Sequence, residues 1–211
     1  MKTTRIGILA LQGDISEHVT ILENAAEKRG IPIEVPEIKK STDLDGLNGL
    51  IIPGGESTTM TRLMGNMEGK SILHLKSRIQ EMANNGLPIF GICAGAILLA
   101  KNVLDRPSDA QHPGTLDLMD VTILRNAYGR QQESFETSLL MPNFGETHIP
   151  GVFIRAPIIQ KVNNDVEVLG SLEKDPVLVK QGNLLAATFH PELTDDLRIV
   201  DYFLNMCESY S

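Results

Sequence analysis

A cysteine flanked by glycines is the strongest chemical signal in the sequence. Cys93 lies at the centre of Gly-Ile-Cys-Ala-Gly (residues 91–95), after the apolar run 88–92, which is typical of a buried strand, and before the run 96–100, which predicts a helix. Such a sharp strand-to-helix turn is a nucleophile elbow, where glycines permit the close backbone approach. The amino end of a helix favours a thiolate. We therefore predict that Cys93 is a nucleophile, although an isolated cysteine in an apolar run is more often a core residue.

A histidine and a carboxylate follow a second buried-strand run. His190 and Glu192 come directly after residues 184–189, so they also belong at the carboxyl end of a strand. A histidine near a cysteine can act as general base and then as general acid, and a carboxylate can hold its tautomer and stabilise its charged form. The motif is weak by itself, because a capping histidine beside a surface glutamate has the same sequence. With Cys93 it predicts a Cys-His-Glu triad.

The remaining histidines and the second cysteine lack such a setting. We predict that His74 and His112 are solvated, and we assign no role to His18 or His148. Cys207 lies in the last predicted helix beside polar residues and is interpreted as structural.

A glycine-rich turn supplies the third part of the candidate site. Pro-Gly-Gly-Glu-Ser (residues 53–57) follows the apolar run 50–53. Its exposed backbone, at Gly55, can provide one donor of an oxyanion hole, and the N–H of Ala94 can provide the other. The alternative is an ordinary turn in which Ser57 caps a helix. Neither glycine spacing typical of phosphate-binding loops is present, and no ligand cluster predicts a metal site.

The elements that must position these residues alternate between strands and helices. Apolar runs at 5–11, 33–35, 50–53 and 88–92 predict buried strands, and helical patterns occupy 14–30, 71–84, 96–100 and 195–210. The second half has shorter strand runs at 121–124, 152–154 and 166–169, and a pair at 177–179 and 184–189 joined by a tight turn. We predict an α/β fold with three α/β/α layers around a mostly parallel sheet, with some antiparallel or hairpin strands in the second half.

Composition restricts the class of protein. The chain has 211 residues, 42% of them hydrophobic, and a net charge of −8, so we expect one domain over residues 1–211 and neither nucleic acid nor a membrane as partner. No apolar run reaches the roughly 20 residues that span a bilayer. Two distant cysteines without a secretory leader favour a reduced, cytoplasmic setting.

Taken together, these motifs resemble the class I, or triad-type, glutamine amidotransferase domains, and among them the glutaminase subunits of pyridoxal 5′-phosphate synthase. The resemblance covers nearly the whole chain and implies the flavodoxin-like fold of that class. The segments that carry it are Leu-Gln-Gly (11–13) with Glu17 and His18, Pro-Gly-Gly-Glu-Ser-Thr-Thr (53–59), Gly-Ile-Cys-Ala-Gly (91–95), Arg125 and Asn126 with Gly-Arg-Gln (129–131), Val-Phe-Ile-Arg-Ala-Pro (152–157) and Phe-His-Pro-Glu-Leu-Thr (189–194).

The resemblance implies a reaction and a set of site residues. Cys93 would attack the carboxamide of L-glutamine, His190 would protonate the departing ammonia and activate water, and Glu192 would orient His190, with no cofactor. The residues that would hold the glutamine are Gly55, Glu56, Ser57, Arg125, Ile154 and Arg155. A free amino acid needs both acceptors and cationic donors. Without the family, Arg125 and Arg155 would be interpreted as surface ion pairs.

The resemblance also implies a partner. In the family the ammonia passes to a (β/α)₈-barrel synthase subunit that makes pyridoxal 5′-phosphate, and docking activates the glutaminase. Gln12 and residues 14–18 are candidate contacts, although an ordinary capped helix start is an equal alternative. The loops 105–114 and 142–150 look longer than in the family, which bears on partner fit rather than on chemistry.

Two other functions stay open at this point. One is a glutaminase subunit of a different amidotransferase, or a related elbow-cysteine hydrolase, which would share the elbow but not Phe-Ile-Arg-Ala-Pro. The other is a non-catalytic scaffold subunit with the same fold, which the three catalytic residue types disfavour.

Overall fold

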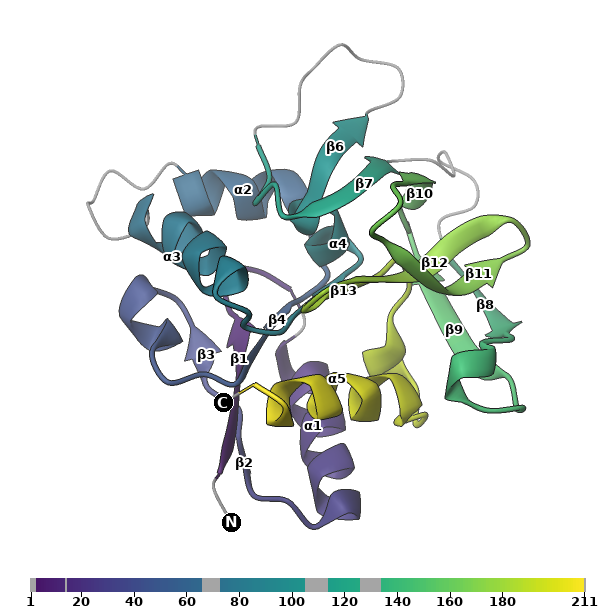
Figure 1. Cartoon of the computed structure of the whole chain (residues 1–211), viewed down its shortest axis with the longest axis horizontal. Coiled ribbons are helices and arrows are strands. Elements are labelled where there is room, and N and C mark those ends of the chain that lie inside the picture. The colour runs from purple at the N-terminus through teal and green to yellow at the C-terminus, as the bar shows by residue number, and fades with distance from the viewer. Residues whose placement is uncertain (1–2, 14, 66–72, 105–113, 126–133, 211) are drawn as a thin grey trace.

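The computed structural model describes residues 3–13, 15–65, 73–104, 114–125 and 134–210 (Figure 1). The helices are α1 (Ile15–Arg29), α2 (Ser57–Gly65), α3 (Leu73–Asn84), α4 (Ala94–Leu99) and α5 (Arg198–Glu208), with 3₁₀ turns η1 (Ser41–Leu44), η2 (Pro142–Phe144) and η3 (Pro191–Leu193). The strands are β1 (Thr4–Leu9), β2 (Ile33–Glu34), β3 (Glu37–Ile38), β4 (Gly49–Ile52), β5 (Ile89–Ile92), β6 (Ala100–Leu104), β7 (Met119–Leu124), β8 (Ser134–Leu139), β9 (Ile149–Ile154), β10 (Ile158–Val162), β11 (Glu167–Leu172), β12 (Asp175–Gln181) and β13 (Leu184–Ala187).

The central sheet confirms the predicted mostly parallel arrangement. Its strand order is β11-β12-β13-β5-β4-β1-β2, with β3 also paired to β1. The strands from β13 through β5, β4 and β1 to β2 pair in parallel, whereas β11, β12 and β13 form an antiparallel edge. The hairpin predicted around residues 177–189 is the β12-β13 pair. The carboxyl ends of β4, β5 and β13 therefore lie side by side.

Helices cover both faces of this sheet, which buries every residue of β4, β5 and β13 (Figure 1). In β4, Ile51 packs on the face covered by α1 and α5, and its neighbours Leu50 and Ile52 pack on the opposite face with α2, α3 and α4. Strands that are buried on both faces have continuously apolar sequences, so these strands could be predicted from the sequence. The three-layer architecture was thus predictable.

The second half contains two smaller sheets that the sequence predicted only in part. β6, β7 and β10 form one of them, and β8 pairs with β9 in the other. The runs at 121–124 and 152–154 identified β7 and β9, but β6, β8 and β10 were missed. In β8 exposed residues alternate with half-buried ones and only Leu139 is buried, and β6 is largely exposed, so neither has a strong apolar pattern.

Several predicted boundaries were wrong for local reasons. The helix expected at 96–100 begins at Ala94, directly after Cys93, and Ala100 instead begins β6. The final helix begins at Arg198 rather than near Asp195, because η3 and the turn after it occupy the preceding residues. The predicted loop 142–150 contains η2 and the start of β9. Asp14 and most of the loop 105–114 lie outside the described residues.

No helix in the described part of the chain has both the length and the apolar character needed to cross a membrane.

Candidate active site

Strand register brings the two predicted reactive side chains to one edge of the sheet. Ala187, the last residue of β13, pairs with Ile92, the last residue of β5. Cys93 follows β5 directly and His190 lies three residues beyond β13, so both emerge at the same level. Backbone hydrogen bonds fix them there: the Cys93 amide donates to the Ala187 carbonyl at 2.8 Å, and the His190 amide donates to the Val152 carbonyl at 2.8 Å.

The elbow has the strained geometry that its sequence predicts. Cys93 has φ 52° and ψ −102°, a conformation that L residues rarely adopt. A Cβ on Gly91 would lie 2.6 Å from the Gly95 carbonyl oxygen, and a Cβ on Gly95 would overlap the Ile52 carbonyl oxygen. Both glycines are therefore needed where β5, β4 and α4 approach one another, and Cys93 stands at the amino end of α4.

His190 is held by Glu192, and its neighbours favour the charged form of the imidazole. Its Nδ1 donates to Oε1 of Glu192 at 2.6 Å, and the Glu192 side chain is buried. Burial alone would lower the pKa of His190, but hydrogen bonds with the Cys93 thiol and with Glu192 outweigh it and raise the pKa to about 10. An imidazolium beside a thiol favours a thiolate–imidazolium pair. The predicted triad is thus assembled in space.

The glycine-rich turn after β4 packs against the triad. A Cβ on Gly54 would lie 2.7 Å from Cε1 of His190 and 3.7 Å from Cβ of Cys93. Gly13 packs closely against the same turn, because a Cβ on Gly13 would overlap the Gly54 carbonyl oxygen. Within the described backbone neither Gly55 nor Ala94 donates its amide to a loop or turn carbonyl. These are the two donors predicted for the oxyanion hole.

A cavity of about 200 Å³ unites nearly all of the predicted site residues. It is lined by Gly55, Glu56, Ser57, Cys93, Ala94, Ile97, Arg125, Ile154, Arg155, Pro157, His190 and Leu193. Glu192 lies behind His190 rather than in the lining. The sequence analysis did not name Ile97, Pro157 or Leu193 as site residues, although Pro157 and Leu193 lie inside the motifs 152–157 and 189–194.

One side of this cavity carries opposite charges. Glu56 accepts hydrogen bonds from the amides of Thr58 and Thr59, so Glu56 caps α2. Ser57, the cap in the alternative interpretation of this turn, is the first residue of the helix. Burial raises the pKa of Glu56, but these bonds and that from the Thr59 hydroxyl lower it to about 2. A guanidinium nitrogen of Arg125 lies 3.5 Å from Oε1 of Glu56. An ionised carboxylate and a guanidinium therefore stand side by side at the cavity.

The end of β9 forms another part of the cavity lining, with Ile154 and Arg155. The carbonyl oxygen of Ile154 lies 3.9 Å from Sγ of Cys93. Arg155 has φ 44°, which places its backbone in the left-handed region, and it is exposed. The motif residues 126 and 129–131 lie outside the described part of the chain.

One histidine of the site was missed. His18 in α1 is 1% exposed, and its Nε2 lies 3.6 Å from Oε1 of Glu192. The signal was available, since His18 shares the helical spacing of the buried residues Ile21, Leu22 and Ala25. His148 is exposed, whereas His112 and the side chain of His74 lie outside what the structure describes. Cys207 is fully buried, as expected of a structural residue.

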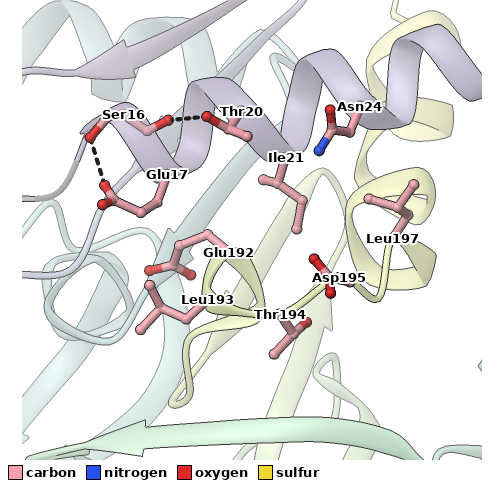
Figure 2. A pocket seen from close by; sticks show the side chains of 10 residues that line it. All are labelled: Ser16, Glu17, Thr20, Ile21, Asn24, Glu192, Leu193, Thr194, Asp195 and Leu197. Atoms are coloured by element: carbon pink, nitrogen blue, oxygen red, sulfur yellow. Dashed lines mark hydrogen bonds between the residues drawn. The ribbon is translucent and has the colours of Figure 1, made fainter.

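A larger cavity of about 480 Å³ lies along α1 and includes neither Cys93 nor His190 (Figure 2). Residues of α1 from Ser16 to Asn24 form one side, and the segment after His190, including Glu192 and Leu193, forms the other. Its lining holds neither a cysteine nor a histidine, and the Ser16 hydroxyl donates to the Glu17 carboxylate at 2.9 Å. The predicted nucleophile and its base both line the smaller cavity. Among the described residues no group of three or more acidic, histidine or cysteine side chains could hold a metal ion.

Comparisons with known proteins show the family to which the chain belongs. A family model described as the SNO glutamine amidotransferase family matches residues 8–209. The chain is 46% identical over 202 residues to "Pyridoxal 5'-phosphate synthase subunit PdxT" of Thermotoga maritima, covering 96% of this chain and 98% of the relative. It is 45% identical to the protein of the same name from Halalkalibacterium halodurans, covering 96% and 94% of the two chains.

Solved structures give the same result at the level of the fold. One described as "Crystal structure of glutamine amidotransferase" superposes with a TM-score of 0.80 and 41% identity, covering 96% of this chain and 98% of that one. A glutamine amidotransferase structure from Thermotoga maritima superposes with a TM-score of 0.60 at 13% identity, covering 99% and 86%, and supports the fold alone.

Proposed function

Because the chain belongs to the SNO glutamine amidotransferase family, we propose that it hydrolyses L-glutamine to L-glutamate and ammonia through a γ-glutamyl thioester on Cys93. The ammonia then serves a partner synthase subunit that makes pyridoxal 5′-phosphate. The observation that carries the proposal is the 200 Å³ cavity, which Cys93 and His190 line together with Gly55 and Ala94. We also propose that residues 1–211 act as one glutaminase domain.

The first half of the reaction uses the charged pair. The Cys93 thiolate attacks the carboxamide carbon, and the amides of Gly55 and Ala94 stabilise the negative oxygen that develops. The His190 imidazolium then gives its proton to the nitrogen as the C–N bond breaks, so ammonia leaves and a thioester remains. The raised pKa of His190, about 10, supports this role because the residue enters the step already protonated.

The second half returns the enzyme to its starting state. Neutral His190 takes a proton from water as the oxygen attacks the thioester carbon. The C–S bond breaks, glutamate forms, and the thiolate–imidazolium pair is restored. Glu192 keeps Nδ1 of His190 protonated, so that Nε2 performs both proton transfers.

Substrate recognition follows from the charges around the cavity. Glutamine carries an ammonium and a carboxylate, and the cavity offers an ionised Glu56 with Arg125 and Arg155 nearby. A carboxylate accepts hydrogen bonds from an ammonium, and a guanidinium donates to a carboxylate. Ser57 and the backbone of Ile154 complete the set of residues that we propose to hold glutamine.

The partner follows from the chemistry of the product. Ammonia in neutral water is mostly protonated and no longer nucleophilic, so its direct delivery to an acceptor preserves its reactivity. The curated relatives are named as subunits of pyridoxal 5′-phosphate synthase, which supports a synthase as that acceptor. We propose a barrel-type synthase subunit that contacts the chain at Gln12 and at the start of α1, where Ser16 is exposed. Of the candidate contacts Gln12 and residues 14–18, His18 is 1% exposed and is not part of this surface. Both cysteines are free thiols, which supports a reducing, cytoplasmic location.

The decisive experiment is ammonia release from glutamine with and without a barrel-type synthase subunit. The proposal expects release from the wild type in the presence of the synthase and none from Cys93→Ala, with the same partner binding for both. A Cys93→Ala variant that releases ammonia at the wild-type rate would refute the assignment. Wild-type binding to the synthase without any glutamine turnover would favour a scaffold subunit.

A further inference from the structure

The buried carboxylate of Glu192 lies between two imidazoles. Its Oε1 accepts a hydrogen bond from Nδ1 of His190 at 2.6 Å, and the same oxygen lies 3.6 Å from Nε2 of His18. The side chain of Glu192 is 3% exposed and that of His18 is 1% exposed. Both contacts are therefore sheltered from water, where electrostatic interactions are stronger than at a surface.

His18 reaches Glu192 from a separate element of the fold. It lies in the first turns of α1, whereas Glu192 lies in η3, and the two segments form opposite walls of the 480 Å³ cavity (Figure 2). His18 belongs to the buried face of α1 rather than to the side that lines this cavity. Its ring is thus held by the packing of α1 on the sheet, independently of the turn that carries His190 and Glu192.

The carboxylate needs a second support. Among the described residues, Oε2 of Glu192 is buried and has no hydrogen-bond partner. A buried ionised carboxylate is stable only where neighbouring donors compensate for the lost water. Both His190 and His18 approach Oε1, and a second imidazole on that oxygen, held by a different element, limits the rotation that one hydrogen bond from His190 would allow.

Resting on the proposed function, we propose that His18 is a positioning residue of the active site, whose Nε2–H holds the Glu192 carboxylate in the plane in which Glu192 orients His190. The site is then a chain of four side chains, Cys93, His190, Glu192 and His18. His18 touches no reacting atom, and it acts through Glu192.

The alternative is a histidine that merely fills space in the core. The two interpretations predict different outcomes once the carboxylate of Glu192 is removed. A positioning residue has no effect on the nucleophile after Glu192 is replaced, whereas a packing residue changes stability with or without Glu192.

The test uses alkylation of Cys93 in the full chain by iodoacetamide at neutral pH. Alkylation needs no glutamine, so its outcome is separate from that of the proposed function. Cys207 is fully buried, and Cys93→Ala verifies that the label enters at residue 93. We expect His18→Leu to slow alkylation about tenfold and His18→Gln, which keeps an N–H donor, to stay within about threefold of the wild type. The matched control is the exposed histidine, as His148→Leu.

A double-mutant cycle then separates the two interpretations. In a Glu192→Gln background, His18→Leu should slow alkylation no further, while thermal unfolding records any effect on packing. The same tenfold loss in that background would overturn the proposal, and so would a wild-type rate for His18→Leu.

A second measurement uses the wild-type protein, so its result does not depend on whether His18→Leu folds. ¹⁵N NMR of histidine-labelled wild-type protein reports which ring nitrogen carries hydrogen. The proposal requires hydrogen on Nε2 of His18. A ring protonated at Nδ1 alone would overturn it.

Discussion

The two cysteines of this chain are both buried and neither forms a disulfide, but we assign them different roles. Cys93 is the proposed nucleophile and Cys207 is a structural residue. Cys93 follows a strand at the edge of the sheet, in a strained conformation, hydrogen-bonded to a charged imidazole and open to a cavity. Cys207 lies in α5 against Gly49 of β4, where burial and the Glu208 carboxylate raise the pKa of its thiol. Burial by itself therefore does not decide what a thiol does. The decisive difference is a cationic partner and a path to the substrate.

Removal of each thiol gives the largest contrast. Cys93→Ala should lower ammonia release in the presence of the synthase by at least about 10³-fold, because no nucleophile remains, with little change in stability. Cys207→Ala should keep the activity and lower the stability by about 1 kcal/mol, the cost of a small cavity. Ammonia assays paired with thermal unfolding would check both variants. Comparable losses of activity in Cys93→Ala and Cys207→Ala would contradict the assignment of different roles to the two thiols.

Replacement of Gly54, which packs against Cys93 and His190, should give the next largest effect and should reduce activity rather than stability. In Gly54→Ala the new Cβ would lie 2.7 Å from Cε1 of His190, so the imidazole must shift. Displacement of a catalytic group by about 1 Å can cost on the order of 10²-fold in rate. We expect that loss in kcat, with the unfolding midpoint nearly unchanged. Gly182→Ala is the matched control, because it lies in a turn where an added Cβ meets nothing within 4 Å.

Gly182 has φ 56°, so this control reports a small cost in stability and none in activity. An active Gly54→Ala enzyme would mean that His190 tolerates a displaced ring.

The glycine that faces Cys207 should behave in the opposite way. A Cβ at Gly49 would overlap Sγ of Cys207 and lie 3.2 Å from Cζ of Phe203. Gly49→Ala should therefore destabilise the protein by about 1–3 kcal/mol through overpacking while leaving kcat unchanged. Cys207→Ala removes the obstructing sulfur, so the double variant should recover part of that loss in denaturant unfolding. Strictly additive losses would show that the sulfur is not the obstacle.

The same contrast explains how far the sequence predicts this molecule. The elbow around Cys93, the glycine turn and the strand before His190 were predictable, because strands buried on both faces have continuous apolar runs and a parallel sheet gathers their carboxyl ends. The contact between His18 and Glu192 was not predicted, since it depends on how α1 packs against η3. Ser57 was the cap in the alternative interpretation because a glutamate that caps its own helix leaves the same Gly-Gly-Glu-Ser pattern. Exposed strands such as β6 lack the alternation that identifies a strand.

Stability against pH gives the smallest and most specific test. His190 has a pKa of about 10 in the folded chain, above its ordinary value of 6.5. Between those values the folded state binds more protons at this residue than the unfolded state, so the contribution of His190 to stability is complete below pH 6.5 and is lost as pH rises toward 10. The pKa of Cys207 is raised above 9.0, so the contribution of this thiol to stability is lost only above pH 9. Urea unfolding of the wild type, His190→Gln and Cys207→Ala from about pH 6 to 10 should then separate the two.

The stability difference between wild type and His190→Gln should shrink steadily across that range, because the variant has no proton to lose. The difference between wild type and Cys207→Ala should stay constant until about pH 9. A flat difference for His190→Gln would mean that the imidazole is neutral at neutral pH. In that case Cys93 would have no cation beside it, and the feature that distinguishes it from Cys207 would be its exposure to the cavity alone.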